Sequence, residues 1–246
     1  MCYHVSNESD AEQLKIDFKL PMDKVEQFKK RYDFNGFEKP FLPVISKENP
    51  RLIDMYRWRL VPHWVKEEKD FKANTLNARN DELFDKTSYR QYWENRCLII
   101  CTGFFEPHYP DLNGKEHESW YIKPKNRKYF ALGGIYSEWN GVKTCSIVTT
   151  DASPLLAEVH NDGKRQPLIL QGDAAMAWLV PNLTQDEMKS LMAYQYPDEQ
   201  LETYRVIDGI YNAKLNTNVP SAITPYERPA FDTLSLYGLD DDKGSD

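Results

Sequence analysis

The chain alternates short apolar runs with polar segments rich in glycine, proline, asparagine and aspartate. Such runs, bounded by turn-forming residues, predict β-strands. They lie at residues 51–61, 96–106, 120–122, 129–136, 144–150, 168–170 and 202–207. Gly103 interrupts the run at 96–106, so we expect that strand to break there.

Other segments carry apolar residues at helical spacing. They predict helices at residues 23–32, 80–95, 173–179 and 185–193. Many short strands with interspersed helices are typical of an α+β fold. We predict a single domain over residues 1–230, built around a curled, mostly antiparallel sheet or barrel with peripheral helices. An acidic tail, expected to be disordered, follows at 231–246.

The composition agrees with one domain of this kind. The chain has 246 residues and 41% apolar content, which is enough for a sizeable core. It lacks an apolar run of about 18 residues, so no membrane span is expected. The N-terminus lacks the basic-then-apolar pattern of a secretory signal. We therefore expect a cytoplasmic protein. We also expect it to be a monomer.

The net charge of −7 argues against electrostatic binding of nucleic acid by the whole protein surface. Any nucleic-acid binding must come from a local basic groove.

Four cysteines are present: Cys2, Cys97, Cys101 and Cys145. On one strand, Cys97 and Cys101 would share a face about 13 Å apart, too far for a disulfide. No ligand spacing of a metal site occurs, so neither metal nor cofactor is expected. The last three cysteines are predicted to be small buried hydrophobes.

Cys2 differs from these because it follows the initiator Met1 directly. Removal of Met1 would leave an amine and a thiol on adjacent carbons. The α-amine has a pKa near ~8, against ~10.4 for lysine, so more of it is neutral at pH 7. A neutral amine condenses with an aldehyde, and the thiol can then close a thiazolidine ring. Cys2 could thus capture an aldehyde covalently.

Three further segments stand out with Cys2. They are residues 76–79 (LNAR), residues 103–106 (GFFE), and His160 followed by 165–170 (RQPLIL). Together with 58–64 (WRLVPHW) and 96–107 (RCLIICTGFFEP), their order resembles the SRAP family. These SOS-response-associated peptidases act on abasic sites in single-stranded DNA. The resemblance runs from Cys2 to about residue 170.

The chain departs from the family pattern at several positions. The family has Gly, Trp, Arg and Met where this chain has Arg59, Pro107, His4 and Gln166, and residues 161–164 lengthen the spacing from His160 to Arg165. Most departures fall on DNA-contact positions of the family, so they bear on DNA affinity more than on chemistry.

The resemblance implies a catalytic set and a DNA-binding set. Cys2, Asn77, Glu106 and His160 are the predicted catalytic residues. Glu106 can take protons during imine formation, and His160 can protonate a departing oxygen. Asn77 can orient the Cys2 amine or a sugar hydroxyl.

The predicted DNA contacts are Arg79, Arg165, Trp64 and His4. The two arginines suit phosphates. Trp64 suits stacking on a base, and Trp58 is assigned to the core.

The predicted function is covalent crosslinking to abasic sites in single-stranded DNA, with possible autopeptidase and AP-lyase activity. Two alternatives remain open. One is an amidase or peptidase of the N-terminal-nucleophile type, with the Cys2 thiolate attacking an amide. The other is a non-catalytic module that binds single-stranded nucleic acid.

Overall fold

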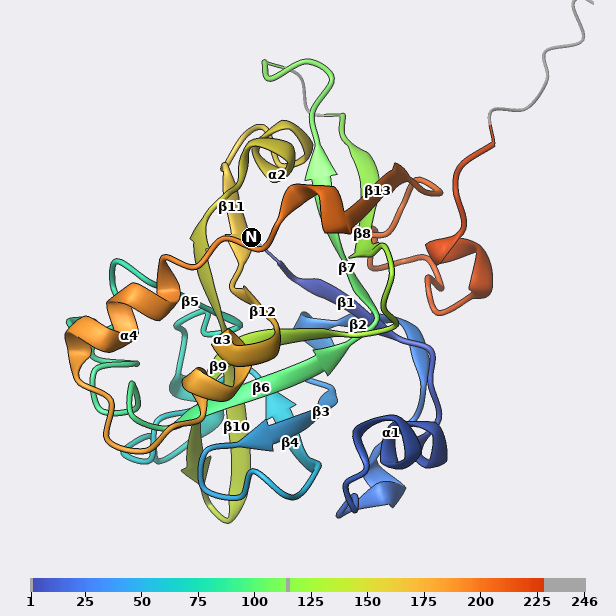
Figure 1. Ribbon diagram of the computed structural model, residues 1–246. Coiled ribbons are helices and arrows are strands. Elements are labelled where there is room, and N and C mark those ends of the chain that lie inside the picture. The colour runs from blue at the N-terminus through green and yellow to red at the C-terminus, as the bar shows by residue number, and fades with distance from the viewer. Residues whose placement is uncertain (1, 114–115, 228–246) are drawn as a thin grey trace, which may run out of the picture.

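The computed structural model describes residues 2–113 and 116–227 (Figure 1). Its centre is a barrel in which each strand pairs with the next and the last pairs with the first. The order is β10 (Val142–Asp151), β4 (Asp54–Trp58), β3 (Phe41–Ser46), β6 (Arg96–Cys101), β9 (Phe130–Trp139) and back to β10. Most pairs are antiparallel, whereas β10 and β4 are parallel.

The β9–β10 hairpin closes the barrel. Its register runs from Ile147 opposite Gly134 to Val142 opposite Trp139. The two turn residues, Asn140 and Gly141, have φ angles of 50° and 75°. This Asn-Gly pair suits a tight turn with positive φ at both central positions, which matches the twist of the flanking strands.

A second sheet packs beside the barrel. Its order is β13 (Leu201–Arg205), β8 (Glu118–Pro124), β7 (Gly103–His108), β1 (His4–Asn7) and β2 (Arg31–Asn35). The predicted strand at 96–106 therefore divides into β6 and β7, one in each sheet. A Cβ atom at Gly103 would lie 2.3 Å from the Tyr121 hydroxyl, so the chain needs glycine where it passes between the sheets.

Short elements complete the fold. Three brief strands extend the larger sheet: β5 (Asn77–Arg79), β11 (Arg165–Pro167) and β12 (Ile169–Leu170). The helices are α1 (Ala11–Phe18), α2 (Pro154–Val159), α3 (Gly172–Trp178) and α4 (Gln185–Met192), and Figure 1 shows α1, α2 and α4 at separate edges of the molecule. The described residues also form the 3₁₀ turns η1 (Val25–Gln27), η2 (Gly36–Glu38), η3 (Glu68–Asp70), η4 (Asp198–Gln200) and η5 (Pro220–Ile223). The predicted α+β class around a barrel is confirmed.

The helix predicted at 80–95 is wrong. This segment is a series of turns, with bonds such as Glu82 N–H to Arg79 O and Tyr92 N–H to Tyr89 O. Its apolar spacing is real, because Leu83, Tyr89 and Tyr92 are buried. The Tyr89 hydroxyl donates to the Asn77 carbonyl at 2.8 Å. Such long-range bonds hold the turns without a continuous helix.

The helix predicted at 23–32 is also wrong. Only the 3₁₀ turn η1 forms there, behind Lys24 with its φ of 50°. Arg31 already belongs to β2, where it pairs with Asn7 of β1. Strand pairing thus overrides the local spacing. Helix α1 was not predicted from the sequence. Asp10 caps it by accepting from the Gln13 N–H at 2.9 Å.

The barrel encloses the main core. Cys97, Cys101 and Cys145 are fully buried in it, as predicted, and so is Trp58. Arg96 is buried as well, and its guanidinium donates to the Trp178 and Val180 carbonyls, which ties α3 to the barrel. Within the described ranges, no helix is long and apolar enough to cross a membrane. The predicted tail at 231–246 lies outside the described residues.

Candidate functional site

The start of the chain reaches the centre of the site through β1. His4 pairs with Phe105 and Val5 with Phe104, antiparallel to β7. Continuing this register brings Tyr3 level with Glu106. Cys2 lies just before the strand and is completely buried. Its thiol donates to the His4 carbonyl, with Sγ 3.7 Å from the oxygen.

Asn77 fixes the backbone of Cys2 from the other sheet. β5 runs parallel to β10, with Asn77 opposite Ile147. From there the Asn77 Nδ2 group donates to the Cys2 carbonyl oxygen at 2.8 Å. The Oδ1 atom of Asn77 is buried and has no hydrogen-bond partner within residues 2–113 and 116–227. An acceptor is therefore available beside Cys2.

Glu106 and His160 form the other half of the catalytic set. Glu106 sits on β7 and is 1% exposed, and His160 follows α2 and is 5% exposed. Their Oε2 and Nδ1 atoms are 3.8 Å apart. The same Nδ1 lies 2.8 Å from the Arg165 carbonyl oxygen, a partner that can only accept. This contact favours the tautomer with its proton on Nδ1 and its lone pair on Nε2.

Electrostatics connect these residues to Cys2. Burial raises the pKa of the Cys2 thiol well above its usual value, and the nearby Glu106 carboxylate adds to the effect. Burial and Glu106 likewise raise the pKa of Tyr3 and of Tyr211. The thiol is therefore neutral at pH 7, and a base must take its proton before or while sulfur attacks. The structure thus brings together all four predicted catalytic residues.

A cleft of about 470 Å³ opens beside this set, with His160 in its wall and Cys2, Asn77 and Glu106 behind its lining. It is lined by Tyr3, Arg79, Pro107, Tyr109, His117, His160, Asp162, Gly163, Arg165 and Tyr211. Gly163 allows a tight fit, because a Cβ atom there would lie 2.8 Å from Cε1 and 2.9 Å from Nε2 of His160. The residues inserted relative to the family pattern thus form part of the wall beside the histidine.

Two of the predicted DNA contacts, Arg79 and Arg165, line the cleft. β10 sets them close, since Thr149 pairs with Arg79 and Asp151 with Arg165. The Arg79 side chain is 43% exposed and forms two hydrogen bonds to Asp81. Arg165 is more enclosed. Its guanidinium donates to Asp151, Asn80 and Thr149, and burial followed by repulsion from Arg79 lowers its pKa.

The other two predicted contacts lie elsewhere. Trp64 is 45% exposed and packs edge-on against Phe71, with ring centroids 6.0 Å apart. It is not among the residues that line the cleft. His4 is 2% exposed, and its Nδ1 is 2.8 Å from Asp33 Oδ1. His4 therefore presents no open surface to DNA in this structure.

The departures from the family pattern have local explanations. Arg59 has a φ of 95°, a conformation that suits the glycine of the family. Its guanidinium donates to the carbonyl oxygens of Phe71 at 2.6 Å and Ala73 at 3.5 Å, which holds the loop that contains these two residues. Gln166 is buried and accepts from the Ser153 N–H at 2.7 Å, at the start of α2.

Tyr211 is a residue of the site that was not predicted from the sequence. It lies after β13, far from the motifs, yet its ring packs edge-on against His4 at 5.0 Å and His117 at 5.2 Å. Its buried hydroxyl has no hydrogen-bond partner among the described residues. No periodicity marks this position, because Tyr211 belongs to an irregular turn.

Comparison with known proteins identifies the class to which this site belongs. The sequence model of the SOS response associated peptidase (SRAP) family matches residues 1–213. The chain therefore belongs to the SRAP family, which confirms the resemblance seen in its motifs.

Individual relatives agree. Abasic site processing protein YoqW of Bacillus subtilis is 30% identical over 182 residues, which cover 72% of this chain and 79% of YoqW. Abasic site processing protein HMCES of Pongo abelii is 26% identical over 218 residues, covering 74% of this chain and 59% of HMCES. A crystal structure of a protein from Bacteroides thetaiotaomicron superposes with a TM-score of 0.82 at 29% identity, covering 92% of this chain and all of that one.

Proposed function

We propose that this protein processes abasic sites in DNA, as the names of its relatives state for them, and that Cys2 captures the site covalently. The observation that carries the proposal is the enclosure of Cys2. The Asn77 side chain donates to its carbonyl oxygen. The Glu106 carboxylate, which lies beside His160, raises the pKa of its thiol. These residues come from separate parts of the sequence and meet at residue 2.

The chemistry begins once Met1 has been removed. The Cys2 amine attacks the aldehyde carbon of the ring-opened abasic sugar and gives a carbinolamine. Loss of one water forms the imine. The Cys2 sulfur then adds to the imine carbon, and the thiol proton ends on nitrogen. The sum is amine, thiol and aldehyde giving a thiazolidine and one water.

The surrounding residues divide the proton transfers. Glu106 takes a proton from the attacking amine and serves as the base for the buried thiol. His160 first gains a proton at Nε2, where this tautomer has its lone pair, and then delivers it to the departing hydroxyl. Asn77 keeps Cys2 in one orientation, and its Oδ1 can accept from the freed amine. Because these groups are already in place, little reorganisation is needed when the aldehyde arrives.

The arginines support a polyanionic substrate. Arg79 is the more exposed and can exchange Asp81 for a phosphate, whereas Arg165 is held by Asp151 and Thr149. Several further points stay predictions: preference for single strands, stacking by Trp64, AP-lyase activity, self-catalysed removal of Met1, a monomeric state and a cytoplasmic location.

The deciding experiment is crosslinking to a single-stranded oligonucleotide with one uracil-derived abasic site. The processed protein should form a heat-stable adduct, and Cys2→Ala should form none without added reductant. Glu106→Gln keeps the shape and removes the base, so single-turnover crosslinking should slow by about 10²–10⁴-fold. A wild-type adduct yield from Cys2→Ala would refute the mechanism.

The same experiment separates the alternatives. An N-terminal-nucleophile amidase would require Cys2 but form no DNA adduct. A non-catalytic module would bind equally well without Cys2 and would ignore the abasic site. Mass spectrometry of the mature N-terminus provides the control, because a retained Met1 blocks the amine.

A further inference from the structure

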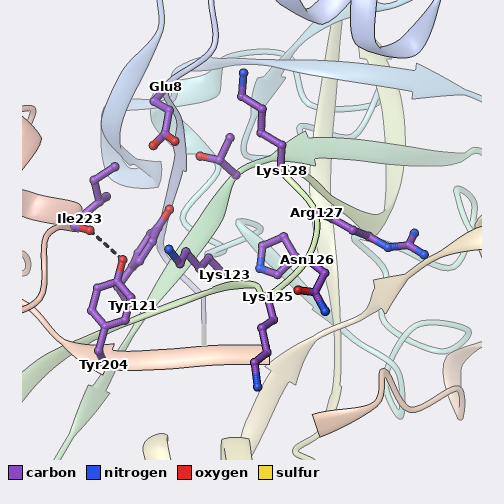
Figure 2. A pocket seen from close by; sticks show the side chains of 11 residues that line it. Glu8, Tyr121, Lys123, Lys125, Asn126, Arg127, Lys128, Tyr204 and Ile223 are labelled. Carbon is purple, nitrogen blue, oxygen red and sulfur yellow. Dashed lines mark hydrogen bonds between the residues drawn. The ribbon is translucent and has the colours of Figure 1, made fainter. Parts of the chain in front are cut away.

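A second pocket lies at the opposite end of the smaller sheet from the cleft. β8 begins at Glu118, next to the cleft residue His117, and ends at Pro124 on the pocket wall. At about 3.3 Å per residue the strand spans roughly 20 Å. That distance corresponds to about six stacked nucleotides at ~3.4 Å each. The pocket encloses about 490 Å³, and Figure 2 shows the side chains around it.

The pocket concentrates positive charge on an acidic protein. Lys123, Lys125, Arg127 and Lys128 all line it, although the whole chain carries a net charge of −7. Lys123 lies 3.4 Å from Glu202, and Lys128 lies 3.9 Å from Asp17. Lys125 and Arg127 are exposed and form no ion pair within the described part of the chain. Such a cluster attracts a polyanion.

The walls of the pocket are rigid. The Tyr204 hydroxyl donates to the Ile223 carbonyl at 2.8 Å, drawn as the dashed line in Figure 2. The Tyr121 hydroxyl lies 2.8 Å from Ser6 Oγ, and Ser6 Oγ lies 3.0 Å from Thr102 Oγ1. These polar groups are therefore hydrogen-bonded within the fold, so the positions of their side chains do not depend on a ligand.

Glu8 is the exception. It is the one acidic residue among those that line the pocket, and its buried Oε2 has no hydrogen-bond partner among the described residues. Because the Glu8 carboxylate borders the pocket, a ligand that supplies a hydrogen-bond donor to it is favoured there. Inorganic phosphate carries its hydroxyl donor on the same anionic group that Glu8 repels. A nucleotide carries an anionic phosphate for the basic residues and, at a separate place, an amino group on its base that can donate to Glu8.

We propose that this pocket binds an unpaired nucleotide of a nucleic-acid strand, with its phosphate at Lys125 and Arg127 and a base amino group at Glu8. Placing that nucleotide on the same strand as the captured abasic site rests on the proposed function. The pocket then holds the undamaged part of the strand while Cys2 reacts about 20 Å away.

The test measures equilibrium binding of a fluorescent oligo-dC of ~15 nucleotides, within the size range of single-strand sites. Lys125→Ala/Arg127→Ala should bind about 5- to 30-fold more weakly. Its salt slope should fall by ~0.7, because Lys125 and Arg127 together neutralise one phosphate. Lys29→Ala/Lys30→Ala removes the same charge from exposed positions outside the pocket and should bind like wild type. Equal binding by the two double variants overturns the proposal.

Base recognition has its own comparison. Wild type should prefer oligo-dC over a baseless spacer oligomer of equal length, and Glu8→Gln should narrow that preference. If wild type binds both oligomers equally, the pocket holds phosphate alone and the nucleotide assignment is wrong. None of these probes carries an aldehyde, so the results are independent of crosslinking by Cys2. Loss of the Cys2-dependent adduct would refute the proposed function and leave these binding results intact.

Discussion

The side-chain amide of Asn77 holds the carbonyl oxygen of Cys2 at 2.8 Å, across 75 residues of sequence. Both groups are buried, so the bond fixes the residue whose amine and thiol are proposed to react. It also joins β5 of the barrel sheet to the segment that leads into β1 of the smaller sheet. The geometry of the proposed nucleophile therefore depends on the two sheets being packed together.

Asn77→Ala should release Cys2 from this position. We expect crosslinking to slow by about 10- to 100-fold, because misplacement of a reacting group by ~1 Å can cost that much. Single-turnover crosslinking measures the effect. Asn49→Ala, at an exposed position, is the matched control and should react at the wild-type rate. Equal rates for the two variants would show that the amide contact is dispensable.

Gly163→Ala should disturb His160 without unfolding the protein. The new Cβ would lie within 2.9 Å of two ring atoms, so the ring must move. Crosslinking or its reversal should slow by about 10- to 100-fold. Gly141→Ala meets nothing within 4 Å but has a φ of 75°. It should lose about 1–2 kcal/mol of stability and keep normal activity. Normal crosslinking by Gly163→Ala together with slow crosslinking by Gly141→Ala would contradict a role for His160.

Tyr211→Phe removes a buried hydroxyl that has no partner among the described residues. Stability should stay the same or rise, because an unsatisfied polar group is lost. If the hydroxyl donates to the bound sugar or phosphate, crosslinking should slow by about 2- to 10-fold. Tyr129→Phe breaks hydrogen bonds to Ser9 and Asp17 and should lower stability alone. A destabilised but fully active Tyr211→Phe would mark Tyr211 as structural.

Arg59 offers a test of backbone strain. Arg59→Ala loses the bonds to the Phe71 and Ala73 carbonyls and keeps the φ of 95°. It should be destabilised by about 2–3 kcal/mol. Arg59→Gly loses the same bonds but relieves the strain, so it should be more stable than the alanine variant by about 1 kcal/mol. Urea unfolding measures both. At exposed Arg51, whose φ is not positive, alanine should be the more stable replacement.

Stability should fall at alkaline pH because of the buried thiols. Burial raises the pKa of Cys2, Cys97, Cys101 and Cys145 above that of a free thiol. In the unfolded chain these thiols ionise near ~8.5, so above that pH the unfolded state binds fewer protons than the folded state. The stabilisation is complete below ~8.5 and declines as pH rises, by up to ~1.4 kcal/mol per pH unit for each thiol.

Urea unfolding between about pH 7 and pH 10 tests this dependence. Cys145→Ala removes one buried thiol, so its stability should decline less steeply with pH than that of wild type. The comparison of slopes does not depend on the absolute stability of the variant. Parallel profiles for the two proteins would show that Cys145 does not contribute.

Local chemistry explains the predictions that succeeded. Gly103 was expected to break a strand, and the chain does pass there from one sheet to the other. The helices predicted at 173–179 and 185–193 form as α3 and α4, the second with a capping box at Thr184 and Glu187. The cysteines of the core were predicted from their apolar neighbours. Each of these outcomes follows from residues adjacent in the chain.

Contacts between distant segments decided the rest. The spacing at 80–95 is helical, yet Tyr89 and Tyr92 bond to residues far away and the segment folds as turns. Trp64 and His4 were both assigned to DNA from the family pattern, but packing leaves one ring exposed outside the cleft lining and the other paired with Asp33.

The sequence alone was enough to predict the α+β class, the family and the identity of the three residues that gather around Cys2. Only the tertiary structure showed that Asn77 holds the Cys2 carbonyl, that Tyr211 faces the cleft, and that four basic residues and Glu8 form a second pocket. The physical reason is the distance along the chain between the residues that interact. Periodicity and motifs report on neighbours in the chain, whereas hydrogen bonds, burial and pKa depend on which strands lie side by side.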